Sequence, residues 1–584
     1  GRKYFLMCCT GAYIMHFGIL VCHTRFGSFD MATIATQAAQ LTPGFAALIG
    51  LCFLVGLGVK AGIWPMHGWL PDAHPVAPSS ISALMSGILT KAGVFGLVKI
   101  LLIVLGAGLT GQWLSLGSHP AFGLLLTGLG CMTVIYGEVM ALREDNLKRI
   151  LAFSTLAQVG EILAMLGLMT SLSVASALLH VMNHAIFKNL LFLAAGGLIA
   201  RAAGKKLSDI AGLGRVMPFT ALCFAIGALA VMGLPPFSGF FSKFMMIYAA
   251  VKADALVVAA LFLAGSVLGA IYYLRIVRVL FFAPWQGNKV AAAPLAMRIA
   301  TGIPAVAVIL GGLFPDYGLQ HWVRPVITQI AGPQQWDVPV FPTLNLAWSP
   351  AALIAIVGAV VCFVVGKRQP HKAGMIATAV MALALAAVLV DAERYDLLSW
   401  WFAVLIAGVG VLNLCYAIGY MDHAHSQHRF FFFFVFMIGG LLGVTASKDL
   451  FNFFAFWEIM SSWTLYFVII HDESQAALRE GFKYFIFNFV GATCMFLGVA
   501  MLCARSDGFG FDAILLAART MSLPWLGAGL LLVLSGLIMK AAQLPWRIDY
   551  QMHPPTAPTP VSGYISAVLL KSGIYGVLKL FAPA

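Results

Sequence analysis

Long apolar runs, each long enough to cross a lipid bilayer, follow one another along almost the whole chain. We count about 17 such runs of roughly 20 residues. Only 10% of the 584 residues are charged, whereas a soluble globular protein carries about 25% charge. A chain this poor in charge cannot cover a water-facing surface, but a helix satisfies its own backbone and can face lipid. The sequence therefore predicts an all-α, polytopic membrane protein.

Part of the sequence recurs at a fixed offset of 480 residues, which is far too long a period for a solenoid. The offset keeps lysines, glycines and prolines in register over about 100 residues, so we infer two copies of one large unit. The recurring residues include Lys3-Tyr4-Phe5 with Lys483-Tyr484-Phe485, Lys60-Ala61 with Lys540-Ala541, Pro65 with Pro545, and Lys91, Gly93, Gly96 and Lys99 with Lys571, Gly573, Gly576 and Lys579.

The boundary between the two copies is expected in the polar segment 317–347. Residues 1–316 then form the C-terminal part of the first unit, and residues 348–584 form the N-terminal part of the second. Because the sequence starts and stops partway through a unit, we expect the gene to continue on both sides of it.

The net charge of +13 does not indicate nucleic-acid binding, because the cations lie in short loops between apolar runs. Four alternate loops are rich in lysine and arginine, which predicts that they face the cytoplasm and that segment 317–347 lies outside. The ten cysteines have no metal-ligand or disulfide spacing, and we interpret them as small helix residues.

Several lysines lie inside apolar runs, beside residues that break a helix. Lys60 and its repeat Lys540 are followed within a turn by Trp64-Pro65 and Leu544-Pro545, and Lys243 follows Pro235-Pro236. A lysine at membrane depth is costly, and a broken helix frees backbone groups that can bind water or ions. The alternative for such a lysine is snorkelling from a helix end to the interface. Two broken helices in one unit also suggest an inverted repeat.

Lys91 and Lys571 lie too deep in their runs, 77–104 and 558–581, for easy snorkelling. Gly93 and Gly573 lie within the next turn and would permit close helix packing. We therefore interpret both lysines as functional.

A row of titratable residues follows in one apolar helix. His180, His184 and Lys188 are spaced four residues apart, which places all three on one helix face. Such a row is typical of a proton relay. A zinc site is the competing interpretation, but no third ligand has suitable spacing.

Three glutamates also lie in apolar runs. Glu458 is in the middle of the run 450–470, where a nearby lysine such as Lys540 would be needed to keep it ionised. Glu161 lies about three turns into its helix and is a further candidate for proton transfer. Glu138 lies near a cytoplasmic loop and is compatible with an interfacial position.

The sequence lacks the catalytic and cofactor-binding motifs of soluble enzymes. It contains no phosphate loop, no dinucleotide fingerprint and no cysteine cluster for iron–sulfur centres. We expect no cofactor and no electron transfer in this chain.

The motifs together resemble those of the antiporter-like membrane subunits shared by respiratory complex I, Mrp-type cation/proton antiporters and membrane-bound hydrogenases. The resemblance covers essentially the whole chain. It is carried by 60–74 (KAGIWPMHGWLPDAH) with Ala77-Pro78, by 146–158 (NLKRILAFSTLAQ), by His180–Lys188 and Gly233–Lys243, and by Trp457-Glu458.

The resemblance implies a unit of 14 helices built from two inverted five-helix bundles, with helices 6–14 of the first unit and helices 1–8 of the second present here. It also implies roles for the lysines. Glu458 and Lys540 correspond to an ion pair, Lys60 to the equivalent lysine of the first unit, Lys91 and Lys571 to relay lysines, and Lys243 to the exit lysine. Residues 544–554 depart from the motif of residues 64–74, so the second unit is expected to conduct differently.

Three functions remain open at this point. The first is a proton-translocating subunit of a redox complex in a bacterial or archaeal cytoplasmic membrane, of the hydrogenase or NADH:quinone oxidoreductase type, with other membrane and peripheral redox subunits as partners. The tandem arrangement favours the formate- or carbon-monoxide-linked hydrogenases. The second is a stand-alone sodium/proton antiporter of Mrp type. The third, a structural anchor, is disfavoured because buried lysines occur in both copies.

Overall fold

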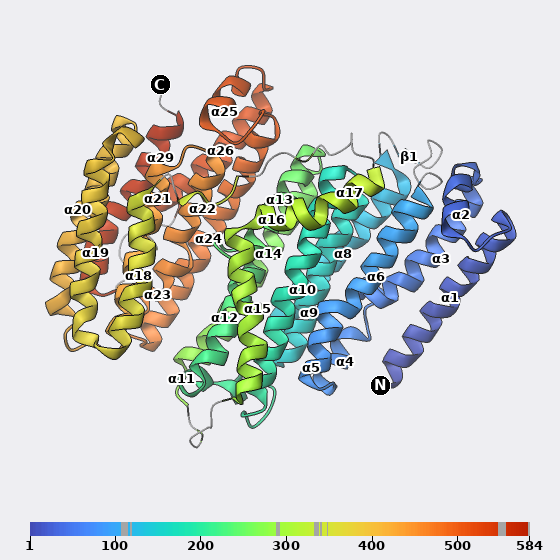
Figure 1. Ribbon diagram of the computed structural model, residues 1–584, viewed down its shortest axis with the longest axis horizontal. Coiled ribbons are helices and arrows are strands. Elements are labelled where there is room, and N and C mark those ends of the chain that lie inside the picture. The colour runs from blue at the N-terminus through green and yellow to red at the C-terminus, as the bar shows by residue number, and fades with distance from the viewer. Residues whose placement is uncertain are drawn as a thin grey trace. The chain divides into compact units, whose positions relative to one another are not determined.

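A computed structural model describes residues 1–106, 115–116, 119–285, 287, 293–331, 338, 342–346, 349–546 and 556–581. The chain forms two compact units. Unit 1 contains residues 1–233 and 237–338, and unit 2 contains residues 234–236 and 339–584. Within each unit, long helices run side by side (Figure 1).

The described residues of unit 1 form helices and one small hairpin. Its strands are β1 (Ser115–Leu116) and β2 (His119–Pro120), which pair antiparallel. Its helices are α1 (Arg2–Phe26), α2 (Met31–Gln37), η1 (Ala38–Gln40), α3 (Pro43–Ala61), α4 (Leu70–Val76), α5 (Ser79–Leu84), η2 (Met85–Leu89), α6 (Thr90–Gly96), η3 (Leu97–Val104), α8 (Ala121–Arg143), α9 (Leu147–Gly167), α10 (Ser171–Ile199), η5 (Ser208–Ile210), α11 (Leu213–Val216), α12 (Pro218–Met232), α13 (Ser238–Lys252), α14 (Leu256–Phe282), α15 (Leu295–Leu313), α16 (Pro315–Gly318), η6 (Leu319–Val323) and α17 (Arg324–Ala331).

Unit 2 is helical throughout its described residues. Its helices are α18 (Pro350–Arg368), α19 (Pro370–Val390), η9 (Ala392–Arg394), α20 (Leu397–Tyr420), α21 (Gln427–Ala446), α22 (Leu450–Ser461), α23 (Trp463–Ile469), α24 (Gln475–Ala504), α25 (Phe511–Ala518), α26 (Leu523–Lys540), α28 (Thr559–Tyr564), η10 (Ile565–Leu569) and α29 (Lys571–Phe581).

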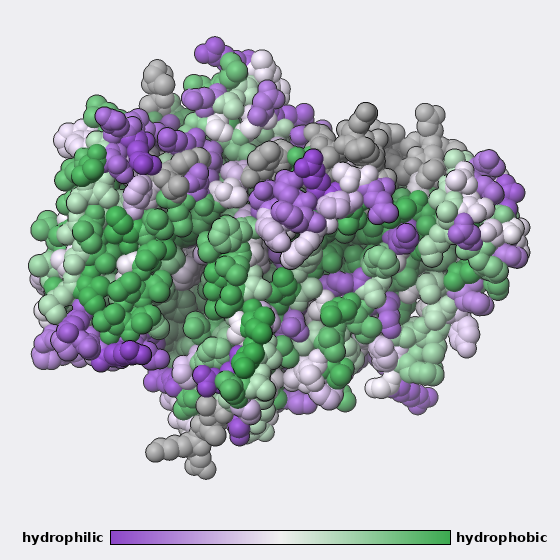
Figure 2. Space-filling model, in the orientation of Figure 1, coloured by the Kyte–Doolittle hydropathy of each residue, from purple (hydrophilic) through white to green (hydrophobic). Residues whose placement is uncertain are grey.

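The described residues contain 15 helices long and apolar enough to cross a membrane, or up to 16 if a bent pair counts as one span. Two of the predicted runs are divided between shorter helices instead. Run 217–250 forms α12 and α13, and run 450–470 forms α22 and α23. Apolar side chains cover the middle of α18, α19 and α20, and hydrophilic ones gather at their ends (Figure 2). The predicted all-α, polytopic membrane fold is confirmed.

The 480-residue repeat is present in the helices as well as in the sequence. Helix α3 begins at residue 43 and α26 at residue 523. The π-helical turns η2 and η10 cover residues 85–89 and 565–569. The two copies therefore share one local architecture.

The predicted close helix contact is also confirmed in both copies. A Cβ added to Gly93 would lie 2.5 Å from the backbone nitrogen of Ala61, and one added to Gly573 would lie 2.4 Å from the carbonyl oxygen of Leu537. Only glycine fits so close to a neighbouring backbone.

The turn that ends α3 has glycine at a position where its repeat has alanine. Gly62 has a φ of 80°, and the corresponding Ala542 has a φ of 56°. Alanine is disfavoured in this left-handed region because of its Cβ, so the second copy carries local backbone strain.

Helices α9 and α22 begin with the same kind of cap. The side chain of Asn146 accepts hydrogen bonds at the start of α9, and Asp449 does the same at the start of α22. Each capping residue also forms an isolated backbone bridge, Asn146 to Lys206 and Asp449 to Gly510. Both helices therefore begin with a side-chain cap, and each capping residue is joined by a backbone bridge to another part of its own unit.

Helix α9 lies wholly inside unit 1, because every residue of its most apolar stretch is buried. It packs against α8 through glycines on both helices. A Cβ on Gly130 would lie 2.4 Å from the nitrogen of Ala164, and one on Gly160 would lie 2.7 Å from the oxygen of Gly130. This contact brings α9 and its polar side chains to the centre of the unit.

Candidate functional site

The predicted row on α10 is at the centre of unit 1. His180, His184 and Lys188 are all fully buried. Their spacing puts them on one face of α10. This helix begins at a Thr170 capping box and packs against α9, α12 and α13.

Lys91 meets this row at His184. Its ammonium contacts His184 Nδ1 through a short hydrogen bond and donates to the carbonyl oxygen of Ser86 at 2.6 Å. The π-helical turn η2 immediately precedes α6, which carries Lys91. An interior lysine therefore contacts the titratable row directly.

His180 links the row to α9 and α13. Its Nδ1 lies 2.9 Å from Ser242 Oγ, and its Nε2 lies 3.1 Å from Gln158 Oε1. The same Nε2 is 3.7 Å from Glu161 Oε2. Both ring nitrogens thus have protein partners.

Glu161 and Lys243 form a buried ion pair. Lys243 Nζ lies 3.3 Å from Glu161 Oε1 and 3.0 Å from Ser266 Oγ. Gln158 Nε2 also donates to Glu161 Oε1 at 3.2 Å. Glu161 is 1% exposed and Lys243 4% exposed, so the pair is withdrawn from water.

Lys188 lies one turn beyond His184 in a polar cage. Its ammonium donates to Ser154 Oγ at 2.7 Å and to the Tyr273 hydroxyl at 3.0 Å. The Ser154 and Tyr273 hydroxyls are themselves 2.9 Å apart. An amine held by hydroxyl groups can pass a proton through them.

The step between His180 and His184 is longer than a hydrogen bond. The ring centroids of His180 and His184 are 6.0 Å apart. Among the described residues, His184 Nε2 and Glu161 Oε2 have no hydrogen-bond partner although both are buried. Buried polar atoms without protein partners are satisfied by internal water, and a water molecule can bridge such a gap.

Lys60 has a different setting from the other predicted residues of unit 1. It is half-buried at the end of α3, with its Nζ 3.5 Å from the Tyr4 hydroxyl. The close contact at Gly93 joins its helix to the helix of Lys91. The helices that carry Lys60 and Lys91 are therefore packed together.

Unit 2 contains the predicted Glu458 and Lys540, both buried. Lys540 Nζ donates to Asn488 Oδ1 at 3.1 Å and lies 5.4 Å from the Tyr484 ring centroid. Glu458 interacts with Lys540 electrostatically. Within the described ranges no hydrogen bond or ion pair joins these two side chains directly, and Glu458 Oε2 is buried without a partner.

Lys571 repeats the backbone contact of Lys91. Its ammonium bonds the carbonyl oxygen of Ser566, as that of Lys91 bonds Ser86. The divergent motif of the second copy lies at residues 544–554, and its residues 547–554 are outside the described part of the chain.

Several residues of the site were not predicted from the sequence, and Asn488 and Glu138 are examples. Asn488, the partner of Lys540, gives no signal in the sequence beyond its polar character in an apolar run. Glu138, which lies near a cytoplasmic loop in the sequence, is 2% exposed. It packs against α14, where Gly265 and Gly269 lie beside its side chain.

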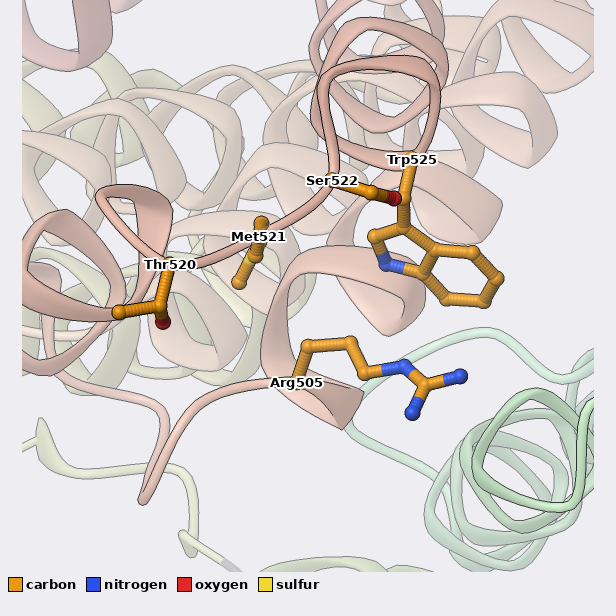
Figure 3. Close-up of a pocket in the computed structure, with 5 residues that line it drawn as sticks. All are labelled: Arg505, Thr520, Met521, Ser522 and Trp525. Atoms are coloured by element: carbon orange, nitrogen blue, oxygen red, sulfur yellow. The ribbon is translucent and has the colours of Figure 1, made fainter.

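A pocket of about 330 Å³ lies elsewhere, at the ends of α24 and α26 (Figure 3). It is lined by Arg505, Thr520, Met521, Ser522 and Trp525. The Arg505 guanidinium lies 4.9 Å from the Trp525 ring centroid, and Arg25 and Phe45 form the same pair in the first copy. The cation–aromatic pair of this pocket therefore occurs in both copies, and the pocket is lined by none of the predicted titratable residues.

No group of three or more His, Cys, Asp or Glu side chains in the described part of the chain is arranged to hold a metal ion. The His180 and His184 rings instead contact Ser242, Gln158 and Lys91. The site is a cluster of amines, imidazoles and carboxylates that can exchange protons.

Comparison with known sequences identifies the family. The sequence profile described as "NADH:quinone oxidoreductase/Mrp antiporter, TM" matches residues 1–269 and 447–584. A second profile, "NADH-Ubiquinone oxidoreductase (complex I), chain 5 N-terminus", matches residues 392–431. Since the first profile matches more than half of the chain, the protein belongs to the NADH:quinone oxidoreductase/Mrp antiporter membrane family, and the predicted resemblance is confirmed.

Three curated relatives are similar over about half of the chain. "Hydrogenase-4 component B" of Escherichia coli (strain K12) is 34% identical over 57% of this chain and 51% of its own length. "NADH-quinone oxidoreductase subunit N" of Desulforudis audaxviator (strain MP104C) is 32% identical over 53% of this chain and 63% of its own length. A Na(+)/H(+) antiporter subunit of Alkalihalophilus pseudofirmus is 30% identical over 49% of this chain and 56% of its own length. The chain thus spans between half and two thirds of these relatives.

A solved structure shows the same fold. A chain of the membrane-bound sulfane sulfur reductase, an archaeal respiratory membrane complex, is 33% identical, with a TM-score of 0.50 over 53% of this chain and 52% of that chain.

Proposed function

We propose that this protein translocates protons across a bacterial or archaeal cytoplasmic membrane, as a membrane subunit of an energy-converting redox complex of the hydrogenase or NADH:quinone oxidoreductase type. The observation that carries the proposal is the buried path Lys91–His184–His180–Glu161–Lys243. Its members come from four helices and contact one another, with one gap wide enough for water.

Electrostatics support transport over a purely structural role. Buried charges and imidazoles are expensive in a membrane and are kept where they carry ions or protons. Because the chain has no redox motif, its driving force would come from partner subunits that carry the electrons. The relatives named hydrogenase component and quinone oxidoreductase subunit support partners of this class.

The test is proton uptake by vesicles that contain the assembled complex, measured with a pH-sensitive dye after the electron donor is added. Lys243→Met should abolish uptake because it removes the amine at the end of the path. Lys252→Met is the matched control, since Lys252 is the exposed lysine at the end of the same helix. Equal uptake by Lys243→Met and the wild type would refute the proposal.

A sodium pulse given without the electron donor distinguishes the proposed function from the competing one. A stand-alone Mrp-type antiporter would exchange sodium for protons under these conditions, whereas the proposed subunit would not. The similarity to a sodium/proton antiporter subunit makes this comparison necessary.

A further inference from the structure

Glu138 is a buried carboxylate that the path above does not use. It lies on α8 and is 2% exposed. In the described part of the chain its Oε2 atom has no hydrogen-bond partner. A buried polar atom of this kind requires an explanation, such as an internal water molecule.

Helix α14 leaves space beside this carboxylate because glycines face it. A Cβ added to Gly269 would lie 3.6 Å from Glu138 Oε2 and 3.7 Å from the Tyr272 hydroxyl. One added to Gly265 would lie 3.7 Å from Glu138 Cγ. The Tyr272 hydroxyl is also buried without a partner among the described residues. Two unpaired polar groups around a missing side chain make a suitable position for water.

This space lies between two lysines of the site. On one side, the Tyr272 ring is 4.8 Å from the ring of Tyr273, whose hydroxyl accepts a hydrogen bond from Lys188 at 3.0 Å. On the other side, Gly265 lies beside Glu138, and the next residue on α14, Ser266, accepts a hydrogen bond from Lys243 at 3.0 Å. Neither connection passes through the two histidines.

We propose that Glu138 carries protons on a second branch, which leads from Lys188 past the Tyr273 and Tyr272 hydroxyls to Lys243. The proposal rests on the proton-translocating function. The Lys188 ammonium gives its proton, through the hydroxyls and water, to the Glu138 carboxylate, which becomes a carboxylic acid. Once the Lys243 ammonium has released its own proton at the end of the path, the acid passes its proton to the resulting Lys243 amine and returns to the carboxylate. One proton moves in each step, and neither transfer within the cluster changes its net charge.

The first experiment measures proton uptake by the assembled complex in vesicles. Glu138→Gln should lower the rate and leave a remainder carried by the histidine branch. Combining it with His180→Phe should abolish that remainder. Gly269→Ala should lower uptake as Glu138→Gln does, because the methyl group fits at van der Waals distance but occupies the space for water. Gly128→Ala on α8 is the matched control, since no atom lies within 4 Å of its added Cβ.

The second experiment detects the proton on Glu138 itself. Infrared spectra of the protein in lipid, recorded during a pH titration, should show a protonated carboxyl band that shifts in heavy water and is lost in Glu138→Gln. A merely structural carboxylate would not produce this band, and Gly269→Ala should move it.

The outcomes separate this inference from the proposed function. If the wild type takes up protons and Glu138→Gln does so at the same rate, the second branch is overturned and the proposed function stands. Absence of wild-type uptake overturns the proposed function, and the infrared band then still decides whether Glu138 takes up a proton. A titration in which Glu138→Gln and the wild type give the same carboxyl bands overturns the inference.

Discussion

The ion pair between Glu161 and Lys243 should behave as one energetic unit. At an effective dielectric constant of about 20, opposite unit charges 3.3 Å apart attract by about 5 kcal/mol. Removing one partner of a buried pair costs about 3–5 kcal/mol, because the remaining charge is left without compensation. We therefore expect Glu161→Gln and Lys243→Met each to lower the free energy of unfolding by about 3–5 kcal/mol.

The double variant should be far more stable than the two losses together predict, because it leaves no unpaired charge. We expect a coupling energy of about 3 kcal/mol. The assay is a double-mutant cycle from the midpoints and slopes of unfolding in mixed micelles of mild detergent and sodium dodecyl sulfate. Glu161→Gln combined with Lys252→Met is the control cycle and should be additive. Additivity of Glu161→Gln and Lys243→Met within about 0.5 kcal/mol would refute the reasoning.

Three further predictions concern other parts of the chain. Ala542→Gly should raise the free energy of unfolding by about 1 kcal/mol because glycine adopts the positive φ without a steric cost; an unchanged unfolding midpoint would contradict this. Partial burial raises the pKa of Asp396, but hydrogen bonds from Lys579 and from the start of α20 together bring it below its ordinary value of 3.8. The stabilisation by Asp396 is thus present above about pH 4 and is lost as the pH falls through the lowered pKa, so the difference in melting temperature between Asp396→Asn and the wild type should be larger at pH 7 than at pH 3. Glu458→Gln should depress proton uptake as strongly as its combination with Lys540→Met does; losses that multiply would show that the two residues act separately.

Hydropathy and helix-breaking residues were sufficient to predict most of the fold. Pro235-Pro236 revealed the break between α12 and α13. The break between α22 and α23 was missed, because residues 450–470 contain neither proline nor glycine. There the hydroxyls of Ser462 and Thr464 bond the carbonyl oxygens of Glu458 and Ile459. Such bonds compete with the backbone hydrogen bonds of the helix. A Ser-Ser pair is too common in sequences to predict a helix break.

The site was predictable to the extent that it depends on spacing within one helix. The row on α10 follows from the period of the helix, and the 480-residue repeat drew attention to Lys91. The burial of Glu138 depends instead on the glycines of α14, which lie more than 100 residues further along the chain. No local sequence pattern indicates such a distant contact, so the position of Glu138 near a loop could not predict its burial.

The enclosure of α9 has a consequence for how the protein is made. A mean hydropathy of 1.6 lets this helix enter the bilayer as readily as a lipid-facing one. Once there, Gln158 and Glu161 would face hydrocarbon until their partners arrive. The glycine contacts between α8 and α9 need no other helix, so the two can enter as a preassembled hairpin. Helices α10 and α13 follow α9 in the chain and would cover its polar face as they are synthesised.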